Sequence, residues 1–170
     1  ASQPAYHRTL AQIGSLTGAV ATIDLKAASD SVSRALVKLL LPKEWYERLD
    51  QLRCRSTLID GRWYRIEKFS SMGNGYTFEL ETLLFLTLCK VLARGSIRED
   101  LSTPGLAISV FGDDIIVPTS ISRSVVLALS FFGFVVNEEK TYLKGPFRES
   151  CGADYYRGFN VRGYRLPAAP

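Results

Sequence analysis

Residues 109–118 read SVFGDDIIVP, two runs of apolar, strand-forming residues on either side of Gly112, Asp113 and Asp114. This pattern predicts two short strands joined by a tight turn. The neighbouring carboxylates are costly to desolvate, and they repel each other. Either the two side chains lie on an exposed polar turn, or the fold gathers them to hold something positively charged.

The composition limits the chemistry that the chain can carry. Its 170 residues suffice for one domain with a core of its own. His7 is the only histidine, which excludes most mechanisms that depend on histidine. Cys54, Cys89 and Cys151 form no C-x-x-C pair, which argues against a zinc site or a disulfide framework and fits a reducing compartment. A metal ion would be held mainly by oxygen ligands, which favours Mg²⁺, with Mn²⁺ as a substitute.

No segment resembles a secretion signal or a membrane anchor. The opening residues ASQPAYHRTLAQIG lack the apolar core of a signal peptide. The apolar run TLLFLTLCKVLA at 82–93 is shorter than the roughly 20 residues that a membrane span needs, and Lys90 interrupts it. We therefore expect no membrane partner. Because Met72 is the only methionine, we expect the chain to be a processed piece or a fragment of a longer protein.

The positive charge of the chain is concentrated near its end. Residues 140–170 contain six basic and two acidic side chains, whereas the remaining residues are neutral overall. Aromatic residues alternate with these basic groups. Basic groups for phosphates and rings for stacking are typical of proteins that bind a nucleic-acid strand. A half-buried antiparallel sheet with arginines on its solvated face is an equally good interpretation.

Apolar periodicity and turn residues predict the order of the elements. A buried strand is expected to end at Asp24, and Asp60-Gly61 indicates a hairpin turn. Ser29 or Asp30 is expected to cap one helix and Ser122 another. Helices are expected at 29–42, 43–55, 77–94 and 122–134, and strands at 18–25, within 56–69, within 106–118 and after 135. Hairpins mixed with helices predict an α+β fold, an antiparallel sheet with helices packed on one face.

Asp24 lies where a carboxylate at the end of a strand can face an open crevice. If its strand shares a sheet with the strands around Asp113 and Asp114, the three carboxylates converge. Three oxygen ligands on rigid elements would suit two Mg²⁺ ions about 3.5–4 Å apart, the arrangement of two-metal phosphoryl transfer. The simpler alternative is an ordinary polar turn.

Two further features are weak evidence when taken singly. The loop SSMGNGY has Gly73 and Gly75, which allow a close approach to a nucleotide, and Asn74, which can bond a ribose hydroxyl. Lys140 follows a strand and could donate a proton to a leaving pyrophosphate. A glycine-rich helix entry and a solvated lysine are the ordinary explanations.

Taken together and in order, five segments resemble palm motifs A to E of viral RNA-dependent RNA polymerases. They are TIDLKAASDS, SMGNGYTFELE, VFGDDIIVP, FGFVVNEEKTY and FRESCGADYYRG. The likeness is strongest to the replicases of single-stranded RNA bacteriophages, and it runs from about Gly18 to Gly158. It implies the catalytic palm of an RNA-directed RNA polymerase, in which the 3′-hydroxyl of growing RNA attacks an NTP and pyrophosphate leaves.

The resemblance also implies roles for individual residues. Asp24 and Asp113 would bind the two Mg²⁺ ions, Asp114 would coordinate less directly, and Lys140 would be the general acid. A second set would lie around the nucleotide and its ribose: Ser29, Asp30, Gly73, Asn74, Gly75 and Thr77. A third set would lie by the RNA and the end of the primer: Gly112, Arg148, Glu149, Ser150 and Arg157.

The chain departs from the family pattern in two places. Asp30 lies six residues after Asp24, whereas many such enzymes use the fifth position, which is Ser29 here. Glu81 stands at a helix position where many relatives have asparagine. Which residue senses the ribose 2′-hydroxyl therefore stays open.

The family surrounds its palm with fingers and a thumb, and this chain has only a short segment before Asp24. We expect residues 1–170 to form a single palm domain from a larger polymerase. Alone, they are expected to fold poorly or to lack polymerase activity. The implied partners are template and nascent RNA, NTPs, the fingers and thumb, and host translation factors as in related phage replicases, in the cytoplasm of a bacterial host.

Other protein classes fit the residues less well. A reverse transcriptase has a similar palm, but its turn usually reads Tyr-x-Asp-Asp, where this chain has Phe111 and Gly112. A phosphoacceptor receiver domain has its paired aspartates at the first strand, whereas here the lone Asp24 comes first. A palm-like module that only binds RNA is the remaining alternative.

Overall fold

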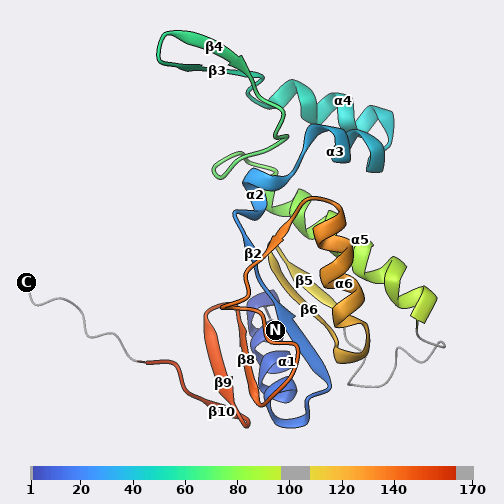
Figure 1. The fold of residues 1–170 in the computed structure, drawn as a ribbon, viewed down its shortest axis with the longest axis vertical. Coiled ribbons are helices and arrows are strands. Elements are labelled where there is room, and N and C mark those ends of the chain that lie inside the picture. Colours follow the sequence, from blue (N-terminus) through green and yellow to red (C-terminus); the bar gives the residue numbers. More distant parts are fainter. Residues whose placement is uncertain (1, 97–107, 164–170) are drawn as a thin grey trace, which may run out of the picture.

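The computed structural model describes residues 2–96 and 108–163 (Figure 1). Its site-bearing sheet is antiparallel and has the order β1–β6–β5. Strand β1 (Val20–Ile23) pairs with β6 (Asp114–Pro118), and β6 forms a hairpin with β5 (Ser109–Phe111). The predicted α+β class and the antiparallel pairing are confirmed. The first residues of the predicted strand pair, 106–107, lie outside the described part.

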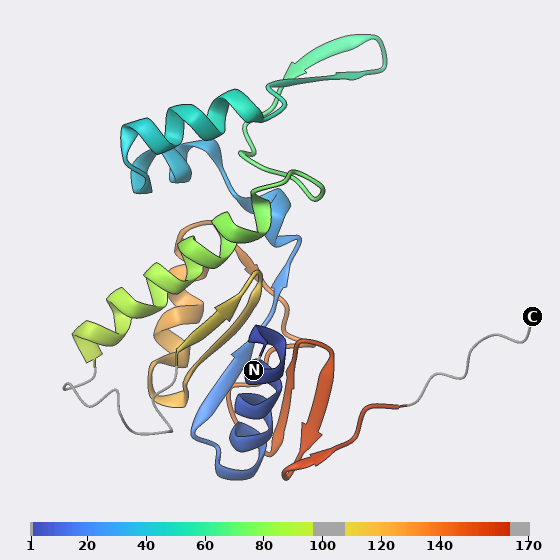
Figure 2. The same cartoon turned by 180° about the vertical axis from the view of Figure 1, so that it is seen from behind.

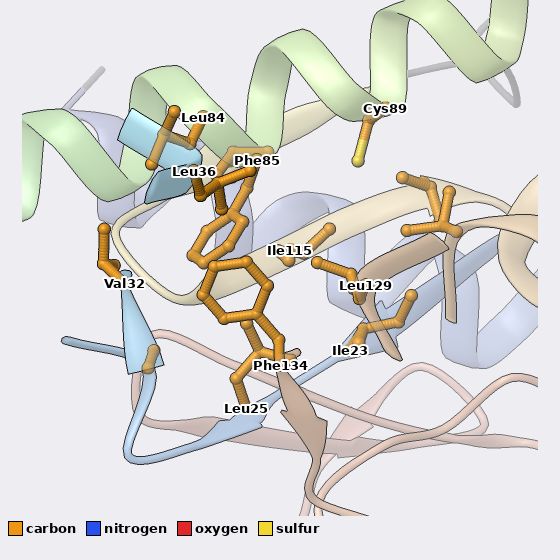
Figure 3. Close-up of a cluster of buried hydrophobic side chains, with 14 of the residues drawn as sticks. Ile23, Leu25, Val32, Leu36, Leu84, Phe85, Cys89, Ile115, Leu129 and Phe134 are labelled. Atoms are coloured by element: carbon orange, nitrogen blue, oxygen red, sulfur yellow. The ribbon is translucent and has the colours of Figure 1, made fainter. Parts of the chain in front are cut away.

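Two helices cover one face of this sheet, as expected. Helix α5 (Thr77–Ser96) and helix α6 (Thr119–Phe131) pack against it, and Ile115 and Val117 point into the shared core. Figure 3 shows Phe85 of α5 meeting Phe134 inside this core, and their rings make an edge contact at 4.9 Å. Burial of these apolar side chains is the main force that holds the sheet rigid behind the turn at Gly112.

Helix α1 (Gln3–Thr17) covers the opposite face, and the sequence interpretation did not include it. The reverse view places α1 in front of the sheet, whereas α6 lies in front in the first view (Figures 1 and 2). Leu10 of α1 packs on Val20 and Ile116. The inward face of α1 is otherwise small or polar, so its apolar pattern is weak: His7, Ala11, Gly14 and Ser15. The prediction that the helices pack on one face of the sheet is therefore correct for α5 and α6, whereas α1 packs on the other face.

A second antiparallel sheet lies beside α1. It has the order β10–β9–β8 and comprises β8 (Phe147–Ser150), β9 (Ala153–Tyr156) and β10 (Phe159–Asn160). A short pair, β2 (Leu25–Lys26) with β7 (Val135–Val136), continues from the end of β1. The predicted strands after 135 are confirmed up to residue 160, and residues 164–170 of the basic segment lie outside the described part.

The helix predicted at 29–42 is divided in two. Helix α2 (Ala28–Ser31) and helix α3 (Arg34–Leu40) are separated by Val32, which is extended because its carbonyl accepts a hydrogen bond from the Phe69 N–H. Ser33, and neither of the two predicted residues, caps α3 through its hydroxyl. The helical pattern is therefore interrupted here by pairing with a segment that is distant in the sequence.

The predicted cap of α6 is also wrong. The helix begins at Thr119, directly after Pro118, so Ser122 lies in its first turn. The Ser122 hydroxyl donates to the Thr119 carbonyl instead of accepting from a free helix N–H. Pro118 ends β6 with an extended ψ of 136°, and the helix follows directly after it.

The remaining elements extend to one end of the molecule. Helix α4 (Lys43–Leu52) is followed by a hairpin of β3 (Ser56–Ile59) and β4 (Arg62–Arg65) that projects away from the other strands (Figures 1 and 2). The predicted turn at Asp60 and Gly61 is confirmed. Within residues 2–96 and 108–163, no helix combines the length and apolar character needed to cross a membrane.

Candidate active site

The register of the central sheet brings the predicted carboxylates together. Ile23 at the end of β1 pairs with Ile115 of β6. The next residue along β1, Asp24, therefore lies beside Asp114 and the turn that contains Asp113. Convergence of these residues is the arrangement that the sequence predicted.

Asp113 is the carboxylate on which burial and the neighbouring charges act together. Burial raises its pKa most, and Asp114 and Asp24 raise it further, while a backbone hydrogen bond and Lys140 act in the opposite direction. The carboxylates are thus close enough to repel one another, and a cation between them would remove this repulsion. An all-oxygen donor set of this kind suits Mg²⁺ or Mn²⁺.

The part of the chain that the structure describes contains no ready-made group of three His, Cys, Asp or Glu side chains around one metal position. This agrees with the ordinary behaviour of Mg²⁺, which binds through one or two protein carboxylates and completes its shell with water and substrate oxygens. The donor chemistry fits a divalent ion that binds together with its substrate.

The other two aspartates are held by different elements. One Asp24 carboxylate oxygen accepts a hydrogen bond of 2.8 Å from the Asn137 side-chain amide. The Asp114 carboxylate accepts one of 3.1 Å from the Ser150 hydroxyl and others of 3.3 Å from the Cys151 N–H. Asp114 therefore faces the β8–β9 hairpin, and the two aspartates of the turn have different surroundings.

A pocket of about 350 Å³ opens beside Asp113. It joins the segment after β2, the glycine-rich loop and the first turns of α5, which are far apart in the sequence. The residues that line it are Ala27, Ala28, Ser29, Met72, Gly73, Asn74, Thr77, Phe78, Glu81 and Asp113. Most of the predicted nucleotide set is thus collected around one cavity.

Three members of that set lie outside the pocket lining or are already engaged. Asp30 is exposed, and its carboxylate forms an ion pair of 2.7 Å with Lys68. Thr77 lines the pocket, but its hydroxyl donates to the Ser71 carbonyl. Gly75 is next to the lining residues and not among them. Of the two candidates after β1, the structure places Ser29 and not Asp30 at the pocket.

Glu81 is the acidic residue whose importance was least evident from the sequence. It lines the pocket, is 6% exposed, and its Oε1 atom has no hydrogen-bond partner among the described residues. Burial, with a smaller contribution from Asp113, raises its pKa to about 7. Its position four residues after Thr77 puts both on one face of α5, and this spacing is a signal that sequence analysis could have used.

Replacing Glu81 with Gln is expected to remove a pH dependence of stability. From pH 4.5 to about 7 the unfolded chain loses the Glu81 proton while the folded chain keeps it, so the free energy of unfolding falls as pH rises. Glu81→Gln should therefore be more stable than wild type at pH 8, by on the order of 1–3 kcal/mol, and similar at pH 4.5. Urea unfolding in EDTA measures this, and exposed Glu79→Gln is the control. A wild-type stability that does not change over this range contradicts the expectation.

The residues predicted to lie near the leaving group and the primer differ in their solvent exposure. Lys140 is exposed and lowers the pKa of both Asp113 and Glu149, so it lies within electrostatic reach of the carboxylates. Burial raises the pKa of Glu149, which is partly exposed. Arg157 is exposed, with its guanidinium 5.4 Å from the centre of the Tyr156 ring.

Arg148 and Ser150 are not available to RNA in this structure, which corrects their predicted role. Arg148 is fully buried, and its Nε donates to the Val20 carbonyl at 2.6 Å. Its Nη1 donates to the carbonyls of Gly145 and Phe147 at 2.9 and 2.6 Å. Ser150 is 1% exposed. The side chains of a strand alternate, and these two point toward α1 rather than outward.

Gly112 is constrained from inside the molecule. Its φ is +62°, and its N–H donates to the Thr82 hydroxyl at 2.8 Å. A Cβ at this position would meet the Phe78 ring at 2.4 Å, and this ring is held by an edge contact of 4.6 Å with Phe111. The expected position of Gly112 by the end of the primer stays a prediction. Phe78 of helix α5 already leaves no room for a side chain at Gly112.

Replacing Gly112 with Ala should therefore cost more than backbone strain alone. We expect a loss of roughly 2–4 kcal/mol, from strain of about 1 kcal/mol and overpacking against Phe78 of about 1–3 kcal/mol. Gly61→Ala is a matched control, because Gly61 also has a positive φ, +76°, but nothing lies within 4 Å of its Cβ position. Thermal unfolding compares the two, and equal losses would rule out the contact with Phe78.

The site thus combines carboxylates that converge at strand ends with a glycine-rich pocket of about 350 Å³ beside Asp113. The family model for "RNA replicase, beta-chain" matches residues 3–166, and the chain belongs to this family.

Relatives with curated names agree with this assignment. The RNA-directed RNA polymerase subunit beta of Qbeta virus (strain MX1) is 47% identical over 90% of this chain. The corresponding proteins of Enterobacteria phage SP and Escherichia phage MS2 are 46% and 45% identical, each over 94% of this chain. The matches cover 25%, 27% and 28% of these relatives, so the chain spans about a quarter of their length.

Proposed function

We propose that this chain is the catalytic palm of a phage RNA-directed RNA polymerase. The observation that carries the proposal is the register of β1 with β6, which collects Asp24, Asp113 and Asp114 beside the glycine-rich pocket. Identity of 45–47% to phage RNA-directed RNA polymerases over nearly all of the chain supports it. The reaction is template-directed attack of an RNA 3′-hydroxyl on the α-phosphate of an NTP.

The residues around the pocket have distinct tasks in this proposal. Asp113 and Asp24 present carboxylate oxygens, and Asn137 keeps Asp24 oriented through its amide. Ser29 and Asn74 lie where a ribose can be bonded. Lys140, at the exposed edge of the site, offers a proton to the departing pyrophosphate.

Asp24 and Asp113, with Asp114 beside them, are the residues that would hold two Mg²⁺ ions or, as a substitute, Mn²⁺. When bound, these ions would promote ionisation of the attacking hydroxyl and neutralise the leaving pyrophosphate. The mutual repulsion that raises the Asp113 pKa supports a cation at this place.

The remaining parts of the enzyme also belong to the proposal. Because the chain spans about a quarter of its relatives, we infer that fingers and thumb segments complete the grip on template RNA, nascent RNA and NTP. Two relatives are named as beta subunits, which supports further subunits, such as host translation factors, as partners in the bacterial cytoplasm.

The test is RNA synthesis by a replicase of the relatives' full length that contains these 170 residues. We expect template-dependent NTP incorporation that requires Mg²⁺ or Mn²⁺ and stops in EDTA. Preference for dNTPs would identify a reverse transcriptase instead. Salt-sensitive RNA binding without synthesis, unchanged in Asp113→Asn, would identify a module that only binds RNA.

A further inference from the structure

A buried chain of hydrogen bonds connects helix α1 to the catalytic turn. The His7 ring is fully buried, with Nε2 2.9 Å from the Ser109 hydroxyl and Nδ1 3.1 Å from the Ser150 hydroxyl. The Ser150 hydroxyl in turn donates to Asp114 at 3.1 Å. Four elements, α1, β5, β8 and β6, thus contribute one polar residue each to a line that ends on the carboxylate beside Asp113.

The donors along this line have a single consistent order. The one Ser150 hydrogen goes to Asp114, so the Ser150 oxygen must accept from His7 Nδ1–H. In the neutral ring, Nε2 then accepts from the Ser109 hydroxyl. Burial lowers the His7 pKa, which favours this neutral form. Every polar atom of the line is paired, which is what a buried network requires.

We propose that His7 and Ser150 are positioning residues that fix the catalytic turn against the β8–β9 hairpin through Asp114. The inference rests on the proposed polymerase function. Asp114 begins β6, directly after Asp113, and the Cys151 N–H holds its carboxylate from the same hairpin. A carboxylate anchored on this side fixes the orientation of the turn, and with it the direction in which Asp113 points.

In this arrangement His7 has a structural role at the site and no chemical one. His7 does not touch the pocket beside Asp113, so it is no candidate for proton transfer to substrate. Its two ring nitrogens instead bridge two serines that come from separate sheets. Loss of the His7–Ser109 bond would leave the buried Ser109 hydroxyl without a partner. Loss of the His7–Ser150 bond would remove the donor that orients the Ser150 hydroxyl toward Asp114.

The experiment uses the full-length replicase and compares His7→Phe, Ser150→Ala and His7→Asn. Phenylalanine keeps a ring and removes both nitrogens, whereas the asparagine amide can still donate to Ser150. We expect kcat to fall about ten- to a hundredfold in the first two variants, as for other small displacements of catalytic groups. The KM for NTP should not change, whereas the affinity for Mn²⁺, measured by electron paramagnetic resonance, should fall, because Asp113 and Asp114 no longer keep their orientation. His7→Asn should recover most of kcat.

Ser122→Ala is the matched control, since Ser122 is 3% exposed and its hydroxyl bonds only a carbonyl of α6. The inference is overturned if His7→Phe and Ser150→Ala keep kcat within about twofold of this control. It is also overturned if Mn²⁺ binding is unchanged in both variants, or if His7→Asn recovers nothing although it unfolds at the control's temperature. Lack of synthesis by the wild type, or full activity of Asp113→Asn, would instead overturn the polymerase function itself.

Discussion

Replacing Asp113 with Asn is expected to reduce RNA synthesis by the full-length replicase at least a thousandfold, about 4 kcal/mol of transition-state stabilisation. Asp113 is the aspartate of the turn whose environment is set by two other carboxylates and Lys140. Asparagine keeps the size of the side chain and removes the charge that would bind a cation. Steady-state incorporation of labelled NTP at saturating Mg²⁺ measures the loss.

Asp60→Asn is the matched control for this substitution. Asp60 lies at the tip of the β3–β4 hairpin with φ at +49°, a conformation that asparagine accepts readily. It should keep activity within about twofold of wild type, as expected for an exposed position away from the site. Comparable losses in the two variants would mean that general destabilisation, rather than a carboxylate at the turn, explains the effect.

Replacing Arg148 with Met is expected to cause a large loss of stability. The Arg148 guanidinium joins the Val20 carbonyl of β1 to the carbonyls of Gly145 and Phe147. Methionine fills similar space but leaves these acceptors unpaired, at a cost of about 1–3 kcal/mol for each one that stays buried. We expect a total loss of at least about 3 kcal/mol in the free energy of unfolding, measured by urea denaturation.

Arg157→Met provides the comparison, because Arg157 is exposed and its guanidinium lies over the face of the Tyr156 ring. Its loss should stay near 0.5–1 kcal/mol, the value of an exposed cation–π contact. If the two arginine variants lose the same free energy of unfolding, then the buried hydrogen bonds of Arg148 stabilise the fold no more than the exposed contact of Arg157 does.

The sequence was most informative where local chemistry decides structure. Three elements are predicted by neighbouring residues alone, and all three occur in the structure. They are the hairpin with the Asp60-Gly61 turn, the long helix after the glycine-rich loop and the strand pair around Gly112. The convergence of Asp24 with Asp113 needed one further assumption, that both strands share a sheet, and the register of Ile23 with Ile115 satisfies it.

The errors come from interactions between distant segments. Val32 interrupts a good helical pattern because it pairs with Phe69, and the residues around Val32 do not predict this contact. Helix α1 was overlooked because Gly14 and Ala11 form its inward face. A Cβ at Gly14 would come within 2.6 Å of Val20, so close approach rather than apolar bulk holds this helix. The resemblance of FRESCGADYYRG to a family motif places Arg148 by the primer, but the motif does not indicate that its guanidinium is buried against β1.

The bond between His7 and Ser150 joins residues 143 positions apart, and this has a consequence for synthesis on the ribosome. At roughly 5–20 residues per second, about 7 to 30 seconds pass between translation of the two. During that interval α1 has emerged but has neither β8 nor β9 to rest on. The turn therefore cannot reach its anchored arrangement until β8 has been made, and α1 makes its final contacts only after that point.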